Sequence, residues 1–158
     1  MTDHPSHILT VACAVGSGVI GGAFFAFSTF VMRALGRLPV AQGIAAMQSI
    51  NVVVLNPWFL SVFVGTALGC GVLSVISLIG WSSADSSYLL AGGAWYIGGT
   101  FLVTLVCNVP WNNALAAVDP TGSDAAKLWK DYLSMWTAWN HVRTVAALVS
   151  TVLLIRAL

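Results

Sequence analysis

The residues best suited to chemistry in this sequence lie together in the segment Asn140-His141-Val142-Arg143. An imidazole can transfer protons near neutral pH or bind a metal ion, and a guanidinium can hold an anion. His141 is the only histidine outside the extreme N-terminus, and the nearest acids belong to a loop that we expect to be solvated. We therefore predict no metal site, and we take His141 and Arg143 as candidate functional residues.

A second polar segment reads Asn108-Val109-Pro110-Trp111-Asn112-Asn113. Pro110 removes a backbone donor and disfavours helix at the preceding residue, so we expect a helix to end or kink here. The asparagines then have two possible roles. They can cap the freed carbonyl groups, or Asn108 and Asn112 can contact a substrate.

Tryptophans accompany both segments, namely Trp111, Trp136 and Trp139. On a helix, Trp136, Asn140 and Arg143 fall on one stripe by steps of four and three. These rings are either an interfacial belt or the wall of a ligand site.

A third polar group precedes the second apolar stretch, where helical spacing places Gln48 beside Asn51. The segment around them, residues 40–55, is too polar to span a membrane and too apolar for a free loop. We predict an interfacial helix across the mouth of a bundle, with both amides in the site. The alternative is a short connector whose amides bond only to backbone.

The composition identifies the surroundings of these groups. Charged residues make up 7% of the 158 residues, hydrophobic residues make up 58%, and the mean hydropathy is +0.89. A domain of this size cannot bury so much apolar surface, so the bilayer must serve as solvent. The net charge of +1, without runs of Lys or Arg, excludes the electrostatic pattern of a nucleic-acid binder.

Apolar stretches long enough to span a bilayer predict an all-α, single-domain four-helix bundle in the membrane. The spans are expected at about residues 8–32, 58–81, 88–109 and 141–158. A further interfacial helical segment is expected over 123–140, capped by Ser123 or Asp124 and running into the fourth span.

Basic residues set the expected orientation. The loop after the first span holds Arg33 and Arg37, and the loop after the third holds Lys127 and Lys130. The positive-inside rule puts these loops in the cytoplasm and both termini outside. Since Gln48, Asn112 and Arg143 all lie beside cytoplasmic ends of spans, the polar cluster is predicted on that side.

With these motifs in view, the sequence resembles the anthrone oxygenase family of small four-helix membrane proteins. The resemblance is carried by residues 108–116, by Trp136-Thr137-Ala138-Trp139-Asn140-His141-Val142-Arg143 and by Asn56-Pro57. It implies oxidation of an anthrone-like methylene by molecular oxygen, without a metal or flavin cofactor. In that reading His141 is the base, Arg143, Asn108, Asn112 and Asn140 hold the oxyanion, and Trp111, Trp136 and Trp139 stack on the substrate.

Helical geometry limits this assignment. Residues two apart lie about 200° from each other around a helix, so His141 and Arg143 cannot both face one pocket of a regular helix. In a regular helix, Asn140 and Arg143 would be the pocket residues. Two functions remain open: an oxygenase-like enzyme for a hydrophobic aromatic substrate, or a non-catalytic lipid- or quinone-binding subunit or small transporter whose polar cluster is structural. The sequence does not indicate an oligomeric state.

Overall fold

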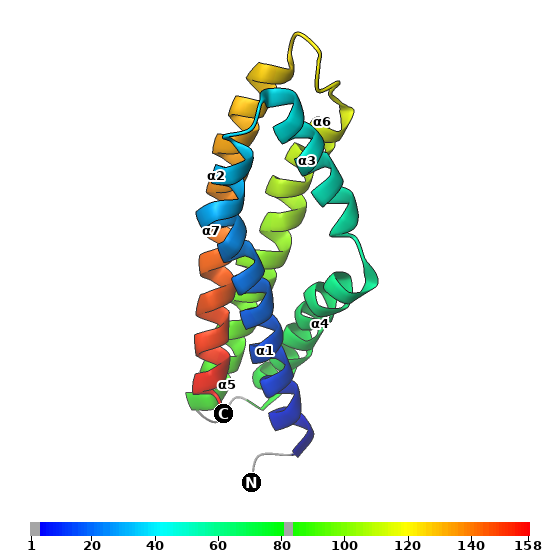
Figure 1. Cartoon of the computed structure of the whole chain (residues 1–158). Coiled ribbons are helices and arrows are strands. Elements are labelled where there is room, and N and C mark those ends of the chain that lie inside the picture. The colour runs from blue at the N-terminus through cyan, green and yellow to red at the C-terminus, as the bar shows by residue number, and fades with distance from the viewer. Residues whose placement is uncertain (1–3, 81–83) are drawn as a thin grey trace.

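The computed structural model describes residues 4–80 and 84–158, and all of its regular structure in these residues is helical. Four helices are long and apolar enough to cross a membrane: Ser6–Leu35, Pro57–Ile79, Asp85–Ala117 and Ala125–Arg156. The start of the first and the end of the last lie at the same end of the molecule (Figure 1). The all-α prediction with four spanning helices is therefore confirmed.

Each long helix is built from consecutive elements. The first consists of α1 (His4–Ala26), the π-helical η1 (Phe27–Val31) and α2 (Met32–Leu35). The second is α4 (Pro57–Ile79), and the third joins α5 (Ala84–Ala94), η2 (Trp95–Leu102), η3 (Thr104–Asn108) and α6 (Val109–Ala117). The fourth is α7 (Ala125–Arg156), and α3 (Val40–Val53) connects the first two. Both α1 and α5 pack against α4 and α7, which encloses a common interior.

The third helix corrects one prediction, because it does not end at the proline. It continues to Ala117, well beyond the predicted end of the span at residue 109. The hydrogen-bond pattern changes from π to α at Val109, so Pro110 lies in the first turn of α6. A proline is tolerated in that position because the missing N–H is needed least there.

The fourth helix is continuous from Ala125 to Arg156, so the predicted interfacial segment 123–140 and the span 141–158 form one helix. The early start agrees with the prediction, but the cap does not. Asp124 occupies the N-cap position without a side-chain hydrogen bond to the helix. In the loop before α7, the exposed carboxyl group of Asp119 accepts hydrogen bonds from the backbone N–H and from the hydroxyl of Thr121. These bonds, the backbone one most, hold the pKa of Asp119 below its usual range.

The short helix α3 coincides closely with the segment predicted at 40–55 and contacts α2, α6 and α7 (Figure 1). A side chain at Gly43 would come within 2.9 Å of both Leu35 O and Trp129 Cζ2, so the close approach requires glycine. Asn56 then caps α4 by accepting a hydrogen bond from Phe59 N (3.0 Å), with Pro57 at the first helical position.

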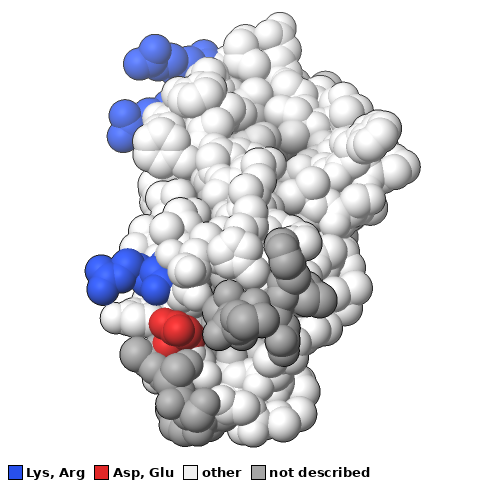
Figure 2. All heavy atoms as spheres, turned by 90° about the horizontal axis from the view of Figure 1, so that it is seen from below, with Lys and Arg blue, Asp and Glu red and all other residues white. Residues whose placement is uncertain are grey.

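The interior divides into two packed clusters. One, around Ile20, Cys70, Leu73 and Tyr96, fills the half near the termini. The other, around Met47, Leu115, Tyr132 and Trp136, lies where α3 closes over α6 and α7. Seen from the end with the termini, the surface is almost free of charge, and the Lys and Arg side chains in view lie along one side (Figure 2). On the sides of the bundle, exposed apolar side chains such as Val19, Leu68 and Val106 give a surface that suits contact with lipid.

Candidate functional site

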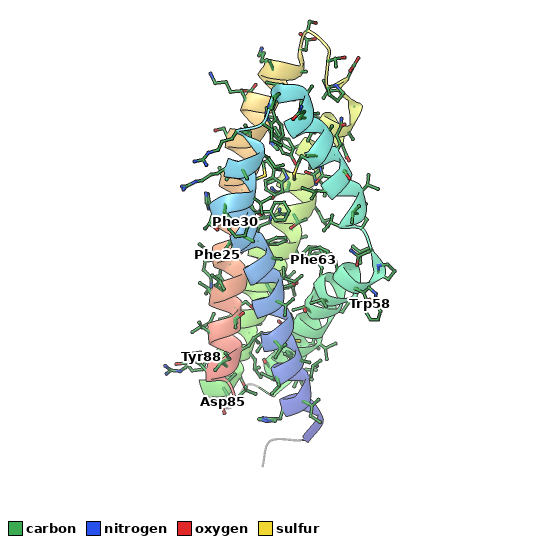
Figure 3. The ribbon with its side chains drawn as sticks, viewed as in Figure 1. Phe25, Phe30, Trp58, Phe63, Asp85 and Tyr88 are labelled. Carbon is green, nitrogen blue, oxygen red and sulfur yellow. The ribbon has the colours of Figure 1, made fainter. Side chains whose placement is uncertain are left out.

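A cavity of about 470 Å³ lies between the two clusters and receives side chains from every long helix and from α3. Its walls are mainly apolar, and six of the lining residues are aromatic: Phe24, Phe27, Phe59, Phe63, Phe101 and Trp136. Phe63 points from α4 toward the interior, whereas Trp58, which lies near the start of the same helix, points away (Figure 3). Its size and apolar character match those of small-molecule sites.

Among the residues that the structure describes, Arg143 is the only charged one that lines this cavity. Its side chain is 5% exposed, and its Nε donates to Asn140 Oδ1 (2.8 Å) while Nη1 donates to Thr104 Oγ1 (3.3 Å). The guanidinium carbon stands 3.9 Å from the centre of the Phe24 ring and 4.8 Å from that of Trp136. No carboxylate lines the cavity, so the positive charge is held by neutral oxygens and aromatic faces.

Asn140 fixes the orientation of this guanidinium from behind. Its Nδ2 donates to Phe24 O and to Ser28 Oγ, both at 2.7 Å, which leaves Oδ1 directed at Arg143. Ser28 Oγ is also 3.1 Å from Thr144 Oγ1. Asn140 is fully buried and does not line the cavity, so it acts on the site through Arg143.

A second polar group lies in the cavity wall beneath α3. Asn112 Oδ1 accepts hydrogen bonds from Trp136 Nε1 (2.7 Å) and from the hydroxyl of Tyr132 (2.9 Å), and Asn51 Nδ2 approaches that hydroxyl at 3.5 Å. The rings of Tyr132 and Trp136 stack with centroids 5.8 Å apart. These bonds hold Trp136 edge-on to Asn112 and fix one wall of the cavity.

Two of the predicted amides are used mainly on the backbone. Gln48 lines the cavity, but its Nε2 donates to Leu115 O (2.8 Å) and Val118 O (3.1 Å) and so closes the end of α6. Asn108 is fully buried and donates to Trp136 O (3.0 Å), with its Oδ1 left without a partner. The asparagines around Pro110 do not cap that helix; Asn108 and Asn112 join it to α7.

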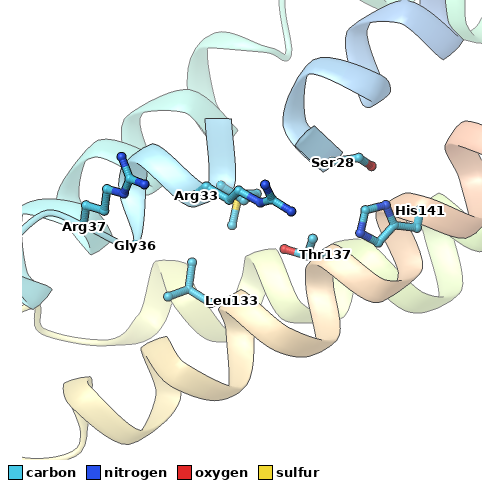
Figure 4. Close-up of a pocket in the computed structure, with 8 residues that line it drawn as sticks. Ser28, Arg33, Gly36, Arg37, Leu133, Thr137 and His141 are labelled. Atoms are coloured by element: carbon cyan, nitrogen blue, oxygen red, sulfur yellow. The ribbon is translucent and has the colours of Figure 1, made fainter. Parts of the chain in front are cut away.

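His141 lies outside this cavity. The regular helix α7 turns it to the opposite side from Arg143, where it is exposed and lines a second hollow with Thr137, Arg33 and Arg37 (Figure 4). Trp111 packs against the cluster around Tyr132, and neither Trp111 nor Trp139 lines the cavity. Of the predicted site residues, Gln48, Asn51, Asn112, Trp136 and Arg143 line it.

Sequence reasoning missed the phenylalanines and Thr104. Phenylalanine in an apolar span gives no signal, since the same residue faces lipid or core in any membrane helix. It also missed the π-helical segments, which carry Phe27 and Ser28 in η1, Phe101 in η2 and Thr104 in η3. Such segments often occur at functional sites, but no residue pattern here announces them.

The rim of the cavity is apolar and exposed. Val52 (73% exposed) and Leu55 (65%) come from the end of α3 and the turn that follows, and Leu105 (47%) comes from η3. The cavity therefore opens sideways between α3, α4 and the third helix, toward the surface that would meet lipid, and the polar groups lie at its inner end.

The described residues contain no group of three metal-ligating His, Cys, Asp or Glu side chains. In comparisons with known proteins, the sequence model of the anthrone oxygenase family matches residues 58–153. The match includes nearly all of α4 and α7 and the whole third helix, and therefore Phe63, Asn112 and Arg143. No curated protein and no solved structure matches the chain.

Proposed function

Since the chain belongs to the anthrone oxygenase family, we propose that it oxidises a hydrophobic polycyclic aromatic ketone with molecular oxygen, without a cofactor, in the cavity at Arg143. The observation that carries this proposal is the buried guanidinium without a carboxylate at the inner end of an aromatic cavity. The phenylalanine walls suit a flat apolar ring system, and the cation suits the carbonyl oxygen of such a ring.

The reaction requires an anion, and Arg143 is suited to stabilise it. In an anthrone, loss of a proton from the central methylene spreads negative charge onto the carbonyl oxygen. A guanidinium beside that oxygen favours the anion, and an apolar enclosure strengthens the interaction. The proton passes to water, because Arg143 is the only ionisable side chain among the described residues of the wall, and it serves as the cation that holds the anion.

The electron-rich anion then gives an electron to oxygen, and the two radicals combine to a peroxide at the former methylene carbon. Loss of the second carbon-bound proton with cleavage of the O–O bond leaves a new carbonyl. One oxygen atom enters the product and the other leaves as water, so the methylene is oxidised by four electrons and O₂ is reduced by four.

His141 has no role in this proposal. It belongs to the other face of α7, and a proton transfer from the cavity would have to cross the buried layer formed by Asn140 and Ser28. The amide of Asn112, whose oxygen already accepts two hydrogen bonds, directs its remaining Nδ2 donor to substrate.

The test is oxygen uptake by membranes that contain the protein and a simple anthrone, corrected for spontaneous oxidation in empty membranes. Arg143→Met should lower the corrected rate by at least about 100-fold, and Arg143→Lys should retain part of it. Arg156→Met makes the same chemical change at an exposed position of the same helix and should leave the rate unchanged.

His141→Asn decides between the two candidate residues. A rate lost in His141→Asn and retained in Arg143→Met would overturn the proposal and return the base to His141. A rate equal to background in the wild type would overturn the oxygenase assignment for this substrate.

A second candidate function is binding of an aromatic ligand, such as a quinone, without turnover. It is favoured by the amides of Gln48, Asn108 and Asn140, whose donors are used on backbone carbonyls. Quenching of tryptophan fluorescence by added quinone, lost in Arg143→Met, without anthrone-dependent oxygen uptake, would identify this function.

For the orientation, the proposal keeps the cytoplasmic assignment of the end that carries Arg33, Arg37, Lys127 and Lys130. In this arrangement the polar end of the cavity faces the cytoplasmic half of the bilayer. Labelling of single cysteines placed at Lys127 and at Arg156 in intact cells tests it, and we expect labelling only at the second position.

A further inference from the structure

A second hollow, of about 420 Å³, lies on the other side of α7 from the aromatic cavity. It is formed between the end of the first helix and the middle of α7. Figure 4 shows Arg33, Thr137 and His141 around one space, with Arg37 beside it. Leu133, Met32, Gly36 and Ser28 complete the lining. Apart from Ser28, which accepts a hydrogen bond from Asn140, none of these residues has a role in the proposed oxidation.

The hollow concentrates positive charge. Arg33 and Arg37 are one helical turn apart, and His141 adds a ring nitrogen that can donate. No Asp or Glu lines it. Two guanidinium groups in the lining, with no acid among its described residues, provide the donors with which proteins bind phosphate.

Thr137 is an independent sign of a missing partner. Other threonines of the same helix satisfy their hydroxyl groups on the carbonyl four residues earlier, as Thr144 does on Asn140 O (2.7 Å) and Thr151 on Ala147 O (2.9 Å). The Thr137 hydroxyl is buried and has no partner. In proteins, buried hydroxyl groups normally have a hydrogen-bond partner. The Thr137 hydroxyl is therefore an unused donor in a residue that lines the basic hollow.

The position of the hollow in the fold indicates which kind of phosphate-bearing molecule can reach it. Arg33 lies at the end of the first spanning helix, where it meets the interface. Along α7 toward the middle of the span, the face of His141 continues with the exposed Val145 and Leu148. A lipid can place its phosphate among the arginines and its acyl chain along this apolar face.

We propose that this hollow binds the phosphate group of an anionic membrane lipid. The positive-inside rule accounts for arginines at this end, but it requires neither the histidine nor the unpartnered threonine in the same space. Free phosphate has the same headgroup chemistry but gains nothing from the apolar face, so the two sources can be separated by experiment.

The test is native mass spectrometry of the full-length protein in detergent, with added phosphatidylglycerol, phosphatidylcholine or inorganic phosphate. We expect one phosphatidylglycerol to be retained at activation energies that remove phosphatidylcholine and inorganic phosphate. Equal retention of the two lipids, or retention of inorganic phosphate alone, would overturn the proposal.

Variants locate the site. Arg33→Gln and Arg37→Gln should each weaken phosphatidylglycerol binding by about tenfold, and Thr137→Val should weaken it less. Lys127→Gln removes the same charge from an exposed position near the same end, outside the hollow, and should leave binding unchanged. Binding that is equally weakened by Lys127→Gln, or unchanged in the arginine variants, would show general charge attraction and overturn the site.

Discussion

The aromatic cavity and the basic hollow flank the same stretch of α7 and differ in how they treat positive charge. Arg143 is buried against the rings of Phe24 and Trp136 and is fixed by hydrogen bonds from two directions. Arg33 and Arg37 are exposed at the end of a helix and line an open hollow. The first arrangement suits a reaction in an apolar, rigid site, and the second suits reversible binding of a headgroup.

Between the two lies a thin layer of hydrogen bonds. Ser28 lines the basic hollow and accepts from Asn140, whose oxygen accepts from the Arg143 of the cavity. His141 and Arg143 can both donate hydrogen bonds, but they line different hollows, because α7 directs residues two positions apart to opposite sides. The segment 140–143, which looks like one site in the sequence, therefore contributes to two separate hollows.

The largest effect is expected from filling the cavity. Ala23 lines it from α1, so Ala23→Phe places a ring in the space of the substrate. Anthrone-dependent oxygen uptake should fall to background, while the protein remains folded because the new ring occupies existing apolar space. Phosphatidylglycerol binding, measured on the same preparation, should be unchanged. Loss of both would show that the two sites are not separate.

The next effect concerns the layer between the sites. Asn140→Leu leaves Phe24 O, Ser28 Oγ and the Arg143 Nε without their partner, which should cost about 2–4 kcal/mol of unfolding free energy. Gln48→Leu removes two bonds at the partly exposed end of α6 and should cost about 1 kcal/mol. Denaturant unfolding in detergent measures both, and a cost for Asn140→Leu no greater than that for Gln48→Leu would contradict the buried network.

The smallest effect separates two threonines of α7. In lipid-free detergent, Thr137→Val should be neutral or stabilise the protein by up to about 1 kcal/mol, since it removes an unpartnered buried hydroxyl. Thr144→Val removes a bonded hydroxyl and should destabilise it by about 1 kcal/mol. Thermal unfolding of the two variants gives the comparison. A destabilised Thr137→Val would mean that its hydroxyl has a partner in the protein.

Much of the fold follows from the sequence, because spanning helices carry a long uninterrupted apolar signal. The sequence also predicts that Asn140 and Arg143 share one face of their helix, because helical spacing alone places His141 on another face. The extent of the third helix does not follow. The effect of Pro110 depends on the π-helical turn before it, and that turn is determined by packing between helices and not by local propensity.

The cavity itself is the least predictable part. Its polar members were visible as costly residues in an apolar chain, but its walls are phenylalanines like those that face outward at Phe25 and Phe30 (Figure 3). Which ring turns inward depends on the relative rotation of the long helices. Single-sequence patterns of hydrophobicity do not contain that information in spans that are apolar on every side.

The exposed apolar rim at Val52, Leu55 and Leu105 affects how turnover must be measured. A substrate that enters through this rim is drawn from the hydrocarbon phase, so the rate depends on its mole fraction in the membrane and not on its total concentration in the suspension. At a fixed amount of anthrone, adding empty lipid vesicles would then dilute the substrate and raise the apparent KM. If the active site opened to water instead, added vesicles would act only by lowering the concentration of free anthrone in the aqueous phase. The KM expressed as that free aqueous concentration would then stay constant.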